Sequence, residues 1–102
     1  MGRVISVADA RAIKAAMVQA VEGPLGRQFT TGAKVAGVTT AGKSGTAELG
    51  GTGEPHSWFI GFAPAEDPAI VIAVLVERAG RGAEVAAPIA GDLMTRFLKG
   101  TP

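Results

Sequence analysis

Three strand-like segments follow one another with short connections, and this spacing constrains the fold more than any other feature of the sequence. The segments are residues 43–48, 57–63 and 69–77. Glycine-rich residues 50–53 separate the first two, and a turn at 64–68 with proline at both ends separates the last two. Parallel neighbours need crossover connections of about a dozen residues or more, so these short connections predict an antiparallel meander.

The second and third segments have different residue patterns. Trp58, Ile60 and Phe62 alternate with other residues, which places them on one face of a strand. Residues 69–76 are all apolar, which is typical of a strand buried on both faces. Before the meander the pattern is weak, and we expect at most one further short strand, near Lys34 and Val35.

A helix is predicted on each side of the strands. In residues 6–22, apolar residues recur at spacings of three and four: Ala10, Ile13, Met17, Ala20 and Val21. Ser6 and Asp9 form a capping-box-like start to this helix. In residues 84–98, apolar residues recur at steps of four: Val85, Ile89, Leu93 and Phe97. Pro88 is compatible with this second helix only in its first turn. The predicted fold class is α+β, an antiparallel three-stranded meander flanked by an N-terminal and a C-terminal helix.

Composition narrows the class of protein. A chain of 102 residues is one domain at most, and 47% hydrophobic residues are ordinary for a globular protein. A net charge of +1 provides no electrostatic argument for nucleic acid as a partner. The absence of cysteine excludes disulfides, thiolate catalysis and zinc sites built from cysteine, and we expect no cofactor or metal. No apolar run approaches the roughly 18 residues that a membrane span needs.

Residues 37–48 contain two overlapping motifs. Residues 37–44 match G-x-x-x-x-G-K-S, the pattern of a phosphate-binding loop. Lys43, Ser44 and Gly45 also match the K-T/S-G strand of penicillin-recognising enzymes. A phosphate-binding loop needs a buried strand before it and a helix after it. Residues 32–36 are short and mixed, and residues 45–51 have no helical stripe, so nucleotide binding is the weaker alternative.

Five stretches occur in one order along nearly the whole chain: residues 3–6, 41–48, 56–64, 70–77 and 86–89. With this ordered set, the chain resembles the C-terminal part of the transpeptidase domain of a class B penicillin-binding protein. A lone K-S-G would be a weak signal, whereas the ordered set is specific.

This resemblance implies a membrane-anchored, extracytoplasmic enzyme of cell-wall and cell-shape biosynthesis. In that family, a serine in an S-x-x-K motif attacks the D-alanyl-D-alanine end of a peptidoglycan stem peptide, and β-lactams acylate the same serine. A second motif, S-x-N, helps to move protons. The K-T/S-G strand lines the third side of the cleft. The expected partners are therefore the stem peptide and β-lactams.

The resemblance also assigns roles to four residues of this chain. Lys43 would attract the terminal carboxylate of the substrate and polarise the proton network. The Ser44 and Thr46 hydroxyls would hydrogen-bond the same carboxylate, and Gly45 would let the substrate backbone lie close to the strand. The backbone N–H of Thr46 would be one of two oxyanion-hole donors.

Two of the family's motifs are missing from the sequence. The residues three positions after Ser6, Ser44 and Ser57 are not lysine, and the chain contains no asparagine. Residues 1–102 are therefore expected to be an incomplete transpeptidase domain that is inactive alone, with the N-terminal part of the same domain as its partner. Without that part, the strand at 69–77 is expected to expose an apolar edge. The chain is then expected to dimerise edge to edge, to shield the edge with its own loops, or to aggregate as its concentration rises. A non-catalytic binding module of the same fold is an alternative.

Overall fold

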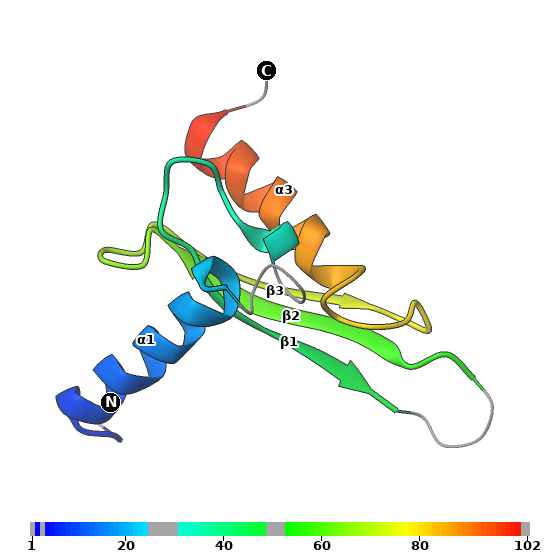
Figure 1. Cartoon of the computed structure of the whole chain (residues 1–102), viewed down its shortest axis with the longest axis horizontal. Coiled ribbons are helices and arrows are strands. Elements are labelled where there is room, and N and C mark those ends of the chain that lie inside the picture. The colour runs from blue at the N-terminus through cyan, green and yellow to red at the C-terminus, as the bar shows by residue number, and fades with distance from the viewer. Residues whose placement is uncertain (1, 3, 25–30, 49–52, 101–102) are drawn as a thin grey trace.

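A computed structural model describes residues 2, 4–24, 31–48 and 53–100. The elements, in chain order, are α1 Val7–Glu22, η1 Thr31–Ala33, β1 Ala41–Ala47, β2 His56–Ala63, β3 Ile70–Val76 and α3 Ala86–Lys99 (Figure 1). The strands form one antiparallel sheet in the order β1-β2-β3. The predicted meander between two helices is confirmed, with bounds that differ by one or two residues.

The register of the sheet divides its side chains between two faces. Trp58 lies opposite Gly45 on β1 and opposite Leu75 on β3. Directly paired residues of an antiparallel sheet share a face, and neighbours along a strand alternate. Phe59 therefore points to one face, and Trp58 to the other. Phe59 is fully buried, so its face carries the core.

Helix α3 covers the core face through small residues, and this corrects the expectation from its sequence pattern. Its buried residues are Ala86, Ala87, Ala90, Gly91 and Met94. The apolar residues that recur every four positions do not form the face that packs against the sheet. Ile89, Leu93 and Phe97 are exposed, and Phe97 is 61% exposed. The reason is close approach: a Cβ atom on Gly91 would lie 2.3 Å from the carbonyl oxygen of Gly32, which belongs to η1. Large side chains would not fit in this contact.

Strand β3 is not buried on both faces, although its apolar run predicts this. Val74 is its only buried residue, and it belongs to the core with Phe59. On the other face, Val71 is 79% exposed and Leu75 is 45% exposed. The cause is the position of β3 at the edge of a sheet whose second face is largely uncovered by the described residues.

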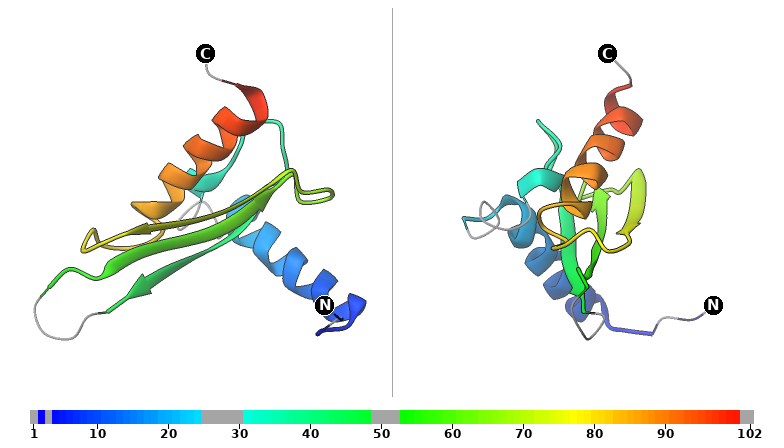
Figure 2. Two further views of the ribbon diagram at one scale, coloured as in Figure 1. Left: turned by 180° about the vertical axis from the view of Figure 1, so that it is seen from behind. Right: turned by 90° about the vertical axis from the view of Figure 1, so that its right-hand side faces the viewer.

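Helix α1 is joined to the sheet at its C-terminal end. Ser6 caps the helix as predicted, because its Oγ accepts a hydrogen bond from the Asp9 N–H at 3.0 Å. At the other end, a Glu22 carboxylate oxygen accepts from the N–H of Thr40 at 2.8 Å, immediately before β1, and Glu22 also pairs with Lys34. The left view in Figure 2 shows the N-terminal end of α1 projecting away from the strands. Lys34 and Val35 lie in an irregular segment after η1, so the short strand predicted there is wrong.

Candidate active site

The K-S-G residues lie in the middle of β1, which forms one edge of the described sheet. Lys43 and Ser44 are strand residues paired with Ile60 and Phe59. A phosphate-binding loop would require these residues at the start of a helix. The phosphate-binding interpretation of residues 37–44 is therefore wrong.

The backbone groups of β1 alternate between β2 and the open edge. The position that a Cβ of Gly82 would occupy is 2.3 Å from the carbonyl oxygen of Gly45 and 2.3 Å from that of Trp58, so both oxygens lie between the two strands. In a trans peptide, N–H and C=O point in opposite directions. The N–H of Thr46 shares a peptide with the Gly45 carbonyl, so it is directed away from β2. The carbonyl of Ser44 is directed to the same open edge by the alternation of the strand.

The ammonium group of Lys43 also lies at this edge. Its Nζ donates a hydrogen bond to the carbonyl oxygen of Ser44 at 2.6 Å, and the side chain is exposed. The strand thus presents a cation, a carbonyl acceptor and an amide donor side by side, along a line without a neighbouring strand among the described residues. An extended peptide that ends in a carboxylate fits such an edge, because it can pair with the backbone and meet the cation.

The hydroxyl groups of Ser44 and Thr46 lie on the core face, opposite the side from which Lys43 leaves the strand. Their register partners are Phe59 and Ser57, which are both buried. Thr46 is exposed, and its Oγ1 accepts a hydrogen bond from the Gly82 N–H at 3.2 Å. The four predicted site residues are therefore contiguous on one open edge, with the Lys43 ammonium meeting the edge from the opposite face to the hydroxyls.

Three residues around this strand were not identified from the sequence. The Oγ of Ser57 donates to the Arg81 carbonyl at 3.0 Å and accepts from the Ala86 N–H at 3.0 Å. The Nδ1 of His56 accepts from the Arg78 N–H at 3.0 Å. Gly82 contacts both Gly45 and Thr46. The break at residues 80–82 is visible in the sequence, but its contact with a strand 36 residues earlier is not.

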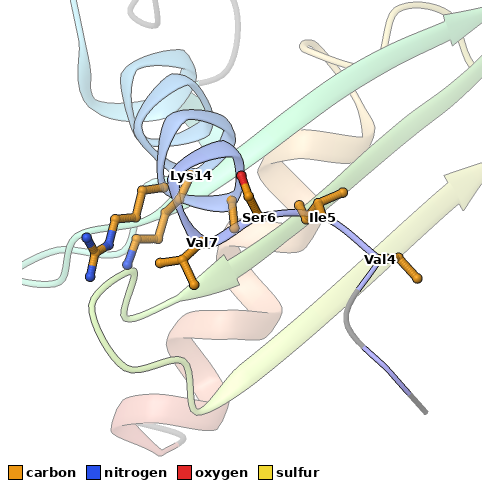
Figure 3. A pocket seen from close by; sticks show the side chains of 7 residues that line it. Val4, Ile5, Ser6, Val7 and Lys14 are labelled. Atoms are coloured by element: carbon orange, nitrogen blue, oxygen red, sulfur yellow. The ribbon is translucent and has the colours of Figure 1, made fainter.

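A hollow of about 360 Å³ lies at the start of α1 (Figure 3). Its lining residues are Val4, Ile5, Ser6, Val7, Ala10, Arg11 and Lys14. None belongs to the K-S-G strand, so this hollow is not part of the candidate site.

Among the described residues there is no group of histidine, cysteine or carboxylate side chains that would hold a metal ion. The helices in the described ranges are also too short or too polar to cross a membrane.

Comparison with protein families shows which family the chain belongs to. A sequence model of the penicillin-binding protein transpeptidase domain matches residues 1–95. The chain belongs to this family. Peptidoglycan D,D-transpeptidase PbpA of Mycolicibacterium smegmatis is 49% identical in an alignment of 63 positions that covers 54% of this chain and 13% of that protein. The probable peptidoglycan D,D-transpeptidase PbpC of Pseudomonas aeruginosa is 39% identical in an alignment of 99 positions that covers 88% of this chain and 17% of that protein.

Solved transpeptidase structures share the fold. An imipenem acyl-enzyme complex of penicillin-binding protein A from M. tuberculosis superimposes with a TM-score of 0.78 at 36% identity. The match covers 97% of this chain and 21% of that chain. The meander and its two helices are thus part of the transpeptidase fold, and the chain spans about a fifth or less of the length of these proteins.

Proposed function

We propose that this chain is the C-terminal portion of a transpeptidase domain and forms one wall of the active site of a peptidoglycan D,D-transpeptidase. The observation that carries the proposal is the open edge of β1, where the Lys43 ammonium, the Ser44 carbonyl and the Thr46 N–H lie together. Membership of the transpeptidase family and similarity to a β-lactam acyl-enzyme structure support it.

Each residue of the edge has a defined role in this proposal. Lys43 attracts the terminal carboxylate of the stem peptide and polarises the proton network of the nucleophile. Ser44 and Thr46 hydrogen-bond the carboxylate through their hydroxyls, and Gly45 lets the substrate backbone approach, since no side chain stands on that part of the strand. The Thr46 N–H donates to the oxyanion that forms when a serine attacks the peptide carbonyl.

The remaining parts of the machinery lie outside this chain in the proposal. The sequence has no S-x-x-K and no S-x-N, so the nucleophile, its base and the second motif come from the N-terminal part of the same domain. That part also completes the sheet beside β3 and covers its exposed face. Because peptidoglycan is assembled outside the cytoplasmic membrane, the complete protein acts at the extracytoplasmic face and is anchored there by a segment outside this chain.

A stem-peptide assay on the full-length protein tests the proposal. Peptides that end in D-Ala-D-Ala should release the terminal D-alanine, and peptides with an amidated C-terminus should react at least about tenfold more slowly, because the carboxylate partner of Lys43 is gone. Equal rates for both peptides would contradict the carboxylate role. A folded full-length protein that releases D-alanine from neither peptide would support the alternative, a non-catalytic binding module.

The uncovered edge of β3 gives a second expectation. We expect the isolated chain to associate edge to edge as its concentration rises, because β3 has no further strand on its outer side among the described residues and carries exposed apolar side chains. Sedimentation velocity measures this. Val71→Lys should keep the chain monomeric, whereas Glu66→Lys, in the turn before β3, should not. A wild-type chain that stays monomeric at high concentration would contradict the expectation.

A further inference from the structure

The connection between β3 and α3, residues 77–85, folds back against the strands that carry the candidate site. We call it the β3–α3 loop. It is held at its start by two hydrogen bonds, from the Arg78 N–H to His56 Nδ1 at 3.0 Å and from the Gly80 N–H to the Pro55 carbonyl at 3.0 Å. The buried hydroxyl of Ser57 then holds its second half through the Arg81 carbonyl and the Ala86 N–H. The loop is therefore fixed to the beginning of β2.

This attachment presses Gly82 onto β1. Gly82 is buried, and a Cβ atom there would lie 2.3 Å from the oxygens of Gly45 and Trp58 and 2.8 Å from the nitrogen of Gly45. Real Cβ atoms do not approach backbone atoms so closely, so any other residue at this position would displace the strand or the loop. The contact is made on the core face, because Trp58 directs its side chain to the other face.

The peptide that Gly82 contacts is the one that matters for the proposed chemistry. The Gly45 carbonyl and the Thr46 N–H belong to the same rigid plane, so a push on the carbonyl oxygen tilts the N–H at the open edge. The Gly82 N–H also donates to Thr46 Oγ1 at 3.2 Å. Because Thr46 Oγ1 accepts this hydrogen bond on the side of Gly82, the hydroxyl hydrogen of Thr46 points away from Gly82. The hydroxyl can then donate toward the open edge of β1, where the substrate is proposed to bind.

We propose that Gly82 is a positioning residue for the active site, setting the tilt of the Gly45–Thr46 peptide and the donor direction of the Thr46 hydroxyl. Ser57 acts with it as the anchor of the β3–α3 loop. This inference rests on the proposed function of Thr46, and it adds a loop that meets β1 through the backbone of Gly82. Acyl transfer requires the hydrogen-bond donors of the oxyanion hole to be placed to within a fraction of an ångström. A small shift of the Gly45–Thr46 peptide should therefore change the rate of acylation.

The first test uses the full-length transpeptidase that carries this chain, with acylation by a fluorescent penicillin as the measurement. Gly82→Ala should slow acylation at least about tenfold, while the fraction of molecules labelled at the end of the reaction stays that of the wild type. Arg81→Ala is the matched control, because it keeps the backbone carbonyl that Ser57 holds and removes an exposed side chain. A wild-type rate in Gly82→Ala, or an equal loss in Arg81→Ala, overturns the proposal. A lower final labelled fraction at an unchanged rate also overturns it, since that is the result of a purely structural role.

Ser57→Ala covers the case in which Gly82→Ala does not fold. This change introduces no clash and removes the hydroxyl that bridges the Arg81 carbonyl and the Ala86 N–H. Acylation should slow in the same direction as for Gly82→Ala. An unchanged rate in Ser57→Ala would show that the loop does not position the strand.

The second test uses the full-length protein without antibiotic and does not depend on catalysis. Hydrogen exchange of the Gly82 amide should become at least about tenfold faster in Thr46→Val, which has no acceptor for this N–H, and should stay near the wild-type rate in Thr46→Ser. Equal exchange in all three proteins overturns the contact and the proposal. If exchange behaves as expected and the wild-type full-length protein is not acylated, the proposed function fails and the contact stands.

Discussion

Changing Lys43 to alanine in the full-length protein that contains this chain should slow acylation by penicillin about a hundredfold or more. The Lys43 ammonium is exposed at the open edge of β1 and donates to the Ser44 carbonyl, beside the Thr46 N–H. Its removal leaves the edge without a cation for the carboxylate of the substrate or the antibiotic. Stopped-flow measurement of the acylation rate, at antibiotic concentrations below saturation, tests this expectation.

Two further variants make the Lys43 result specific. Lys43→Arg keeps the charge and should retain part of the rate, although its planar head group does not match the compact ammonium. Lys99→Ala removes a lysine at the end of α3 whose ammonium donates to the Ala36 carbonyl, and it should leave the acylation rate unchanged. A loss of less than about tenfold in Lys43→Ala would be too small for a positioned electrostatic group and would contradict the assigned role.

The isolated 102-residue chain should remain unlabelled by any β-lactam. Acylation requires a serine with a base close enough to take its hydroxyl proton. Ser57 uses its hydroxyl in two hydrogen bonds inside the core, and the Ser6 hydroxyl caps α1. Ser44 is in β1, but the Lys43 ammonium beside it is a hydrogen-bond donor to the Ser44 carbonyl and is not placed as a base. Intact-mass measurement after incubation with penicillin is the direct test.

The full-length protein provides the positive control for this experiment. It should gain the mass of one penicillin, and peptide mapping should place the adduct on a serine in an S-x-x-K motif outside this chain. An adduct on the isolated chain that maps to Ser44 would overturn both the carboxylate role of Ser44 and the location of the nucleophile. The variant Ser44→Ala, treated in parallel, separates such an adduct from non-specific labelling of lysines.

Much of the architecture follows from local sequence. Short connections between three strand-like segments are sufficient to predict an antiparallel meander, because parallel pairing needs crossover connections of about a dozen residues or more. Ser6 caps α1 because its hydroxyl reaches the N–H three residues later, a purely local contact. The position of Lys43, Ser44, Gly45 and Thr46 together on one strand is local too, because they are consecutive residues. Family membership could also be inferred, since the motifs occur in a characteristic order.

The choice of buried faces was decided by tertiary structure. Helix α3 has apolar residues on more than one face, so periodicity alone did not distinguish the stripe of Ile89, Leu93 and Phe97 from the small residues that pack. The close approach of Gly91 to η1 selected the small residues. In β3, composition suggested burial on both faces, but burial depends on what lies above a strand, and the described residues leave the second face of β3 exposed at Val71 and Leu75.

The sequence by itself determined the order of the elements, the meander and the K-S-G strand, because each depends on residues that are close along the chain. Only the tertiary structure decided which backbone groups of β1 reach the open edge, which face of α3 is buried, and that Gly82 packs on Gly45 and Thr46. These features depend on contacts between residues dozens of positions apart, such as the hydrogen bond between Gly82 and Thr46 across 36 positions. Such contacts form only after the sheet and its loops have assembled, and no local pattern encodes their distance.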